Sequence, residues 1–297
     1  PLVKANGTLI SSVQKEIAPL SLAERAYSSI LSDAADMIPF SVVEELSGAK
    51  IDQVFRTTDG TPLESLIVPG LFTYGGYWST FRDEMENART RLEDEKWVLG
   101  EVGEKADYER QLTGLAGDLH ALYRRDFVAR WTGMLDRIEL VPMSNGAPQF
   151  PSLAVASSAA ASPILQLAEA VDRETRLSRF LDMIEGAEVS PEALASGDIG
   201  NQLADAGFDE VERRSGALKR IALNMIRDKA KFQGRAGAAS ASPLQRQQLE
   251  QIEAPLEKWH AFVKGDPVLR NRPVDVVLDG LKDILTNRQA AARSPTG

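Results

Sequence analysis

The chain has 297 residues, 43% of them apolar and 26% charged, with 34 Lys and Arg against 43 Asp and Glu, a net charge of −9. This length and composition are those of an ordinary soluble globular protein with one large or two smaller domains. The absence of Cys excludes disulfide scaffolds, thiolate metal sites and Cys nucleophiles, and the excess of acid argues against a nucleic-acid partner, which needs a basic surface.

Neither a membrane span nor a signal peptide is evident in the sequence. No run approaches the roughly 18 consecutive apolar residues that cross a bilayer, and no charged and apolar leader opens the chain. The sequence begins at Pro1 rather than Met, so we expect a piece of a longer protein.

Helix-start signals recur along the chain. Capping boxes, in which a Ser precedes a Glu or Gln by three residues, occur at Ser21, Ser41 and Ser242. Ser162, Ser190 and Ser242 each precede a proline, a pair typical of an N-cap and the first helical position. Five such starts predict a helix-rich fold.

Only the region around residues 50–80 has a different pattern. Residues 54–58 predict a short strand, followed by a turn at Asp59-Gly60. Residues 66–68 form a brief apolar run. Residues 74–78 (Tyr-Gly-Gly-Tyr-Trp) predict a turn that is rich in aromatic residues.

A long apolar stripe then predicts a helix over about residues 106–140. Its members, spaced three or four apart, are Leu112, Leu115, Leu119, Tyr123, Phe127, Trp131, Met134 and Ile138. A continuous helix of this length would extend on the order of 50 Å. Gly114, Gly117 and Gly133 each weaken it by roughly 1 kcal/mol relative to Ala, so a kink or a break is the alternative.

Shorter helical stripes complete the chain. They cover residues 164–171, 177–184, 218–232, 249–263 and 274–284. Pro255 predicts a kink in the fourth of them, and residues 142–162 and 233–242 have the composition of linkers. We expect a mainly α fold with a helical subdomain and its strand and turn element at 1–141, the linker 142–162, and a second helical subdomain at 163–297, packed with the first as one unit or separate from it.

The sequence predicts no catalytic, cofactor-binding or metal-ligating residue. Glu257 and His260 form an E-x-x-H pair, but a di-iron site needs two such pairs, so a solvated helix face is expected. His120 follows Asp118 by two positions, which face different directions on a helix, so a surface or boundary histidine is expected. The glycines of residues 70–76 match no phosphate-binding pattern.

The densest aromatic cluster consists of Tyr74, Tyr77, Trp78 and Phe81. These residues either form a small core that holds the turn or present an exposed anchor for a partner, and the core is favoured. Tyr74, Tyr77 and Trp78 are therefore candidate protein-interface residues. Trp97 and Trp131 lie in helical stripes and are expected in the core.

Three stretches resemble motifs of one family. Residues 63–77 (Leu-Glu-Ser-Leu-Ile-Val-Pro-Gly-Leu-Phe-Thr-Tyr-Gly-Gly-Tyr) resemble the "vPGLFT-x-x-Gy" signature of the IcmF/TssM family of type VI secretion. Residues 122–142, from Leu-Tyr-Arg-Arg-Asp-Phe to Leu-Val-Pro, and residues 161–175, which contain Ser-Pro and end in Glu-Thr, resemble two further motifs of that family. The three occur in the family's order.

This resemblance implies a structural role rather than an enzymatic one. The family is the large inner-membrane core protein of the secretion machine, and the matching segment is periplasmic, downstream of the membrane spans. The resemblance implies contacts with other copies of the chain, with inner-membrane subunits and, through the parent protein, with an outer-membrane lipoprotein. It implies no cofactor, no nucleic acid and no small-molecule substrate. The family's β-rich lipoprotein-binding domain and its P-loop are not visible here.

Two other functions stay open from the sequence. One is a soluble helical adaptor or regulator unrelated to secretion. The other is an enzyme that uses Asp and Glu pairs alone for acid–base chemistry, although the sequence locates no such pair. We also expect the isolated chain to be monomeric in dilute solution.

Overall fold

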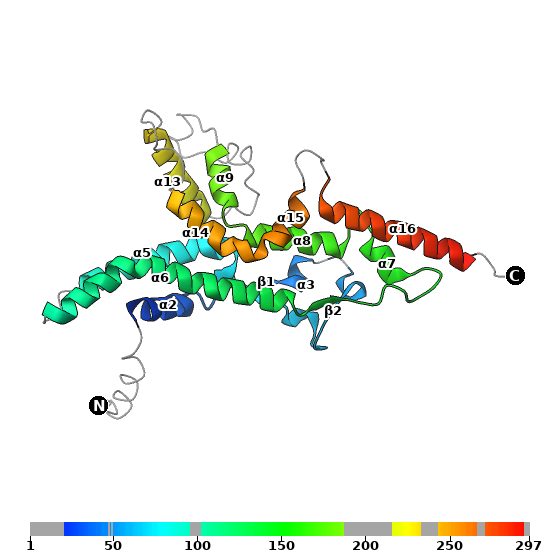
Figure 1. Cartoon of the computed structure of the whole chain (residues 1–297), viewed down its shortest axis with the longest axis horizontal. Coiled ribbons are helices and arrows are strands. Elements are labelled where there is room, and N and C mark those ends of the chain that lie inside the picture. Colours follow the sequence, from blue (N-terminus) through cyan, green and yellow to red (C-terminus); the bar gives the residue numbers. More distant parts are fainter. Residues whose placement is uncertain are drawn as a thin grey trace, which may run out of the picture.

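The computed structural model describes residues 21–95 apart from 47 and 49, and residues 102–186, 216–232, 243–265 and 271–293. The fold is mainly α-helical, as predicted. The helix α6 (Val102–Leu135) runs through the long dimension of the molecule, and α2 (Leu22–Asp33), α5 (Arg82–Glu95) and α14 (Pro243–Glu253) pack along it (Figure 1).

The described part of the chain contains eight further α-helices, most of them short. They are α3 (Val42–Glu45), α4 (Tyr74–Gly76), α7 (Pro151–Ala156), α8 (Pro163–Thr175), α9 (Arg179–Gly186), α13 (Gly216–Phe232), α15 (Glu257–Lys264) and α16 (Pro273–Arg293). The longest of these, α16, packs on α7 and α15 at the end of the molecule opposite the α5–α6 hairpin (Figure 1).

Two small antiparallel strand pairs lie in the described part of the chain. The strand β1 (Phe40–Ser41) pairs with β3 (Ile67–Val68), and β2 (Phe55–Thr57) pairs with β4 (Ile138–Leu140). The predicted strand and turn at 54–60 are thus confirmed, and Gly60 has the positive φ of 73° that a turn glycine permits.

The prediction that the long helix ends at about residue 140 was wrong. The helix α6 ends at Leu135, and Ile138, the last member of the predicted stripe, lies in β4 opposite Thr57. Ile138 still matches the apolar spacing of the stripe because it packs against the same core after the chain has become extended. Helix and strand cannot be separated there by apolar spacing alone.

The helix α6 is otherwise a single helix of 34 residues, without a break at its glycines. A Cβ atom placed on Gly117 or Gly133 would have no neighbour within 4 Å, so these glycines face open space. The residues of the apolar stripe from Leu115 to Trp131 are at most 1% exposed. This continuous buried face offsets the low helix propensity of the glycines.

The predicted aromatic turn at residues 74–78 is also wrong, because this segment is helical. Thr73 caps its start, and the Thr73 hydroxyl accepts a hydrogen bond from the Gly76 N–H at 3.0 Å. The helix α4 continues through a π-helical turn at Tyr77–Phe81 into α5. Gly76 serves close packing, since a Cβ atom there would lie 2.0 Å from the Gly70 carbonyl oxygen.

The predicted caps are present where the structure describes them. Ser21 forms a complete capping box with Glu24. The Ser41 hydroxyl accepts a hydrogen bond from the Glu44 N–H. Ser162, which directly precedes Pro163, accepts a hydrogen bond from the Ile164 N–H with its hydroxyl. The kink predicted at Pro255 is confirmed as a 3-10 turn at Ala254–Leu256. Ser190, Ser242 and Trp97, for which caps or burial were predicted, lie outside the described residues, whereas Trp131 is fully buried.

One hydrophobic core extends through most of the described helices. It includes side chains from α2, α6, α8, α9, α13 and α14. A smaller cluster joins α8 to α16 through Leu165, Val274 and Leu278. The division into subdomains at 1–141 and 163–297 stays a prediction, and residues 142–162 contain α7 and a cis Ala147–Pro148 bond.

Candidate functional site

The aromatic residues considered as a candidate interface are buried. Tyr74, Tyr77 and Trp78 are 3%, 1% and 0% exposed. The Trp78 ring stacks on Phe180 at a centroid distance of 4.4 Å, and Tyr77 meets Tyr123 edge-on at 5.5 Å. Their burial favours the core interpretation, so a surface for partners has to be sought elsewhere.

Hydrogen bonds to backbone carbonyls join the first two recognisable motifs in the core. The Tyr123 hydroxyl donates to the Leu71 carbonyl at 3.0 Å, and the Trp131 indole donates to the Phe72 carbonyl at 2.8 Å. Both bonds join the long helix to the Pro-Gly-Leu-Phe segment. The Trp78 indole, directly after the first motif, donates to the Leu177 carbonyl, just after the third motif. The motif aromatics therefore hold the backbone of irregular segments in place.

A buried polar junction surrounds the connection between α8 and α9. The Glu253 carboxylate, on α14, accepts hydrogen bonds from both the backbone N–H and the hydroxyl of Ser178. Glu253 is only 6% exposed. Burial is the main cause that raises its pKa, to about 7, although the two bonds from Ser178 and the nearby Arg176 act in the opposite direction.

His260, on α15, closes the same junction. The Thr175 hydroxyl donates its single hydrogen to the Val171 carbonyl at 2.6 Å, so at 2.9 Å it can only accept from His260. His260 therefore carries its proton on Nε2. Burial lowers its pKa to about 4, and the ring is neutral near pH 7.

The two members of the E-x-x-H pair lie in different environments. The expectation of a solvated helix face is wrong for His260, which is 3% exposed, while Glu257 points to solvent with its carboxylate 3.9 Å from the ring. Among the residues that the structure describes, no group of three or more His, Asp and Glu could hold a metal ion.

An open groove of about 340 Å³ lies between α6 and α14. Its walls are formed by Gly117, His120, Ala121, Arg124, Leu244, Gln247, Gln248, Gln251 and Ile252. His120 Nδ1 lies 2.8 Å from the Ala116 carbonyl, which can only accept, so Nδ1 carries the proton and Nε2 accepts from the Tyr77 hydroxyl at 3.4 Å. His120 is thus a boundary residue, as expected. His120 and Arg124 lie four residues apart on one helix face, but the other wall of the groove comes from a distant segment, so the sequence analysis did not find it.

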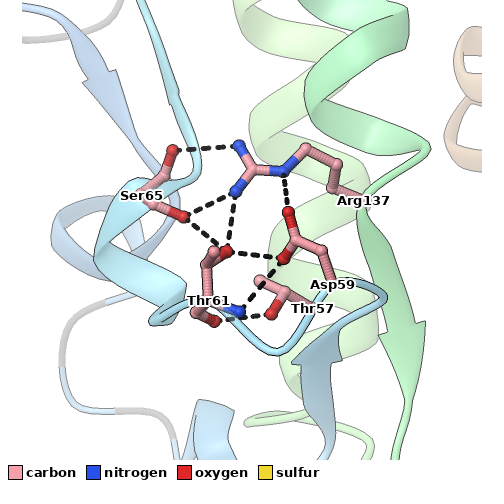
Figure 2. Close-up of polar contacts among 5 residues, drawn as sticks. All are labelled: Thr57, Asp59, Thr61, Ser65 and Arg137. Carbon is pink, nitrogen blue, oxygen red and sulfur yellow. Dashed lines mark hydrogen bonds and ion pairs between the residues drawn. The ribbon is translucent and has the colours of Figure 1, made fainter.

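A second polar network fixes the loop after β2 (Figure 2). The Arg137 guanidinium, just beyond α6, donates to the hydroxyls of Thr61 and Ser65 at 2.8 Å each and pairs with Asp59 at 3.3 Å. Asp59 also accepts from the Thr61 N–H and hydroxyl, and these bonds lower the pKa of its carboxyl to about 2. A shallow open depression of about 560 Å³ lies beside this loop, along β2.

Comparison with known proteins assigns the chain to a family. A family model described as "IcmF-related: Intracellular multiplication and human macrophage-killing" matches residues 1–176, more than half of the chain. The chain belongs to the IcmF-related family. This confirms the resemblance seen in the three motifs, all of which lie within the matched residues.

A curated relative supports the same assignment of this IcmF-related chain. The type VI secretion system component TssM1 of Pseudomonas aeruginosa is 26% identical to it over 220 residues, which are 73% of this chain and 18% of that protein. The chain thus spans less than a fifth of the length of this relative. No solved structure matches it.

The family match does not extend to every site. The Arg137 network and the α6 wall of the groove fall within residues 1–176, whereas α14, the other wall, lies beyond them. In the described part of this IcmF-related chain, no helix has the length and apolarity needed to cross a bilayer.

Proposed function

We propose that this chain is a non-enzymatic structural segment of a type VI secretion membrane complex. It stands in the periplasm as part of a larger inner-membrane protein and helps to form the channel across the envelope through contacts between proteins. Its partners are other copies of itself, inner-membrane subunits and, through the parent protein, an outer-membrane lipoprotein.

The observation that carries this proposal is the family membership together with the relative named as a type VI secretion component. The structure is compatible with it. The aromatic residues in and directly beside the motifs hold the core, since Trp78, Tyr123 and Trp131 all donate to backbone carbonyls. The 34-residue helix α6 gives the segment a long rigid axis.

The periplasmic location can be tested with single cysteines, because the segment has none of its own. Asp118→Cys, on the exposed side of α6, is introduced into the parent protein and treated with a membrane-impermeant maleimide in intact cells. We expect labelling before lysis. The neighbouring buried position, Leu119→Cys, is the matched control and should stay unlabelled unless the segment unfolds. Labelling of Asp118→Cys only after lysis would contradict the periplasmic location.

The role in secretion needs a second experiment. Residues 106–290 are removed in frame from the parent gene, accumulation of the shortened protein in the membrane is verified, and export of the tube protein of the machine is measured. Loss of export at normal protein level supports a structural role. Normal export would show that the segment is dispensable in the machine.

A further inference from the structure

The groove between α6 and α14 differs in charge from the rest of this acidic protein. The chain carries a net charge of −9, yet no Asp or Glu is among the residues that line the groove. Its lining includes one guanidinium, that of Arg124, and Arg82 lies close enough to help lower the pKa of His120 after the larger effect of burial. The lining of the groove therefore carries a positive charge in a chain whose net charge is negative.

Apart from His120, the polar side chains that line this groove have no partner among the described residues. Arg124 makes no ion pair with any residue that the structure describes, although its neighbour Arg125 pairs with Asp126 at 2.7 Å. Gln247, Gln248 and Gln251 likewise make no hydrogen bond within the described ranges. Each glutamine amide can donate and accept, which matches the alternating N–H and C=O groups of a peptide backbone.

The remaining lining residues favour an extended chain over a small enclosed molecule. Leu244 is 62% exposed at one end and offers an apolar contact. The groove is open to solvent and much of its lining is polar, whereas pockets that bury small molecules are concave and mostly apolar. The first turns of α14 add the partial positive charge of a helix N-terminus.

We propose that the α6–α14 groove binds an acidic peptide segment of another protein. A carboxylate of that segment pairs with Arg124, its backbone bonds to the glutamine amides of α14, and an apolar side chain beside the carboxylate covers Leu244. This proposal goes beyond the structural role above and does not depend on it, because the groove exists in the isolated chain.

The test uses the complete chain and two fluorescein-labelled, acetylated peptides. One contains a leucine flanked by glutamates, and the other has glutamines in place of the glutamates. Fluorescence anisotropy should show saturable binding of the acidic peptide, about tenfold tighter than that of the glutamine peptide, and weaker at higher salt.

Single-residue variants test whether the peptide binds in the α6–α14 groove. Arg124→Gln should weaken the acidic peptide about tenfold, whereas Arg130→Gln, an exposed arginine on another side of α6, should leave it unchanged. Gln248→Ala should weaken both peptides, and circular dichroism verifies that each variant is folded. Equal affinity for both peptides, an unaffected Arg124→Gln variant, or displacement of the peptide by inorganic phosphate at similar concentration would overturn the proposal.

Discussion

Glu253 and Ser178 lie 75 residues apart in sequence and form a buried double hydrogen bond in which one carboxylate accepts from the backbone N–H and from the hydroxyl of the same serine. With the bond from His260 to Thr175, it ties α14 and α15 to the connection between α8 and α9. Glu253 and His260, whose pKa values are shifted in opposite directions, thus stabilise the same junction between helices.

Glu253 and His260 together predict that two opposing effects of pH on the stability of the fold compensate each other. The pKa of Glu253 is raised from 4.5 to about 7, so its contribution to stability is complete below pH 4.5 and is lost as the pH rises to 7. The pKa of His260 is lowered from 6.5 to about 4, so its contribution is complete above pH 6.5 and is lost as the pH falls to 4. Between these values the two effects cancel.

Single substitutions should reveal each effect. Relative to wild type, the free energy of unfolding of Glu253→Gln should rise by about 3 kcal/mol as the pH increases from 4.5 to 7, at roughly 1.4 kcal/mol per pH unit. Relative to wild type, His260→Gln should gain a similar amount as the pH falls from 6.5 to 4. Urea denaturation at a series of pH values measures both. A difference that does not vary with pH in either variant would show that the residue titrates normally.

Gly75 and Gly76 are adjacent but should respond differently to substitution. Gly76→Ala places a Cβ atom 2.0 Å from the Gly70 carbonyl oxygen, so we expect a loss of about 3 kcal/mol or more, or failure to fold. Gly75→Ala is the matched control, because the nearest atom lies 4.0 Å away. It should be neutral or more stable by up to about 1 kcal/mol. Thermal unfolding compares them, and equal losses would contradict the close approach at Gly76.

The aromatic bonds to backbone carbonyls should be measurable one at a time. Tyr123→Phe removes only the hydroxyl that donates to the Leu71 carbonyl and should cost about 1 kcal/mol of unfolding free energy. Trp131→Phe also leaves a cavity and should cost about 3 kcal/mol. Urea denaturation distinguishes them. Wild-type stability of Tyr123→Phe would mean that the Leu71 carbonyl finds another donor.

The Arg137 network should govern the order of one loop rather than global stability. Arg137→Met removes bonds to Thr61 and Ser65, so amide hydrogen exchange across residues 57–65 should accelerate about tenfold, while the melting temperature changes little. Arg56→Met is the control, because among the described residues this arginine pairs with Glu139 alone, at an exposed site. Similar exchange in both variants would argue against the network as the element that fixes the loop.

Local signals were sufficient for much of the fold. The caps at Ser21 and Ser162 and the kink at Pro255 follow from side-chain hydrogen bonds and ring geometry within a few residues, so the sequence predicts them directly. The strand at residues 54–58 was predicted, but its partner β4 was not, because the two lie more than 80 residues apart and apolar spacing continues from α6 into β4.

The candidate sites depended far more on the tertiary structure. His120 and Arg124 are one turn apart on a predicted helix, but the glutamines of α14 that complete the groove are more than 120 residues away. His260 was expected at the surface, since nothing near it in sequence shows that Thr175 is its partner.

The sequence by itself determined the mainly helical class, the helix starts at Ser21, Ser41 and Ser162 and, through three motifs, the family. These depend on periodicity, caps and short patterns, which act over a few residues. Only the tertiary structure decided that Gly76 is a packing contact, that Tyr74, Tyr77 and Trp78 are core, and that a positive groove opens between α6 and α14. Each of these depends on which distant segments meet, and that is set by burial of the whole core rather than by any local pattern.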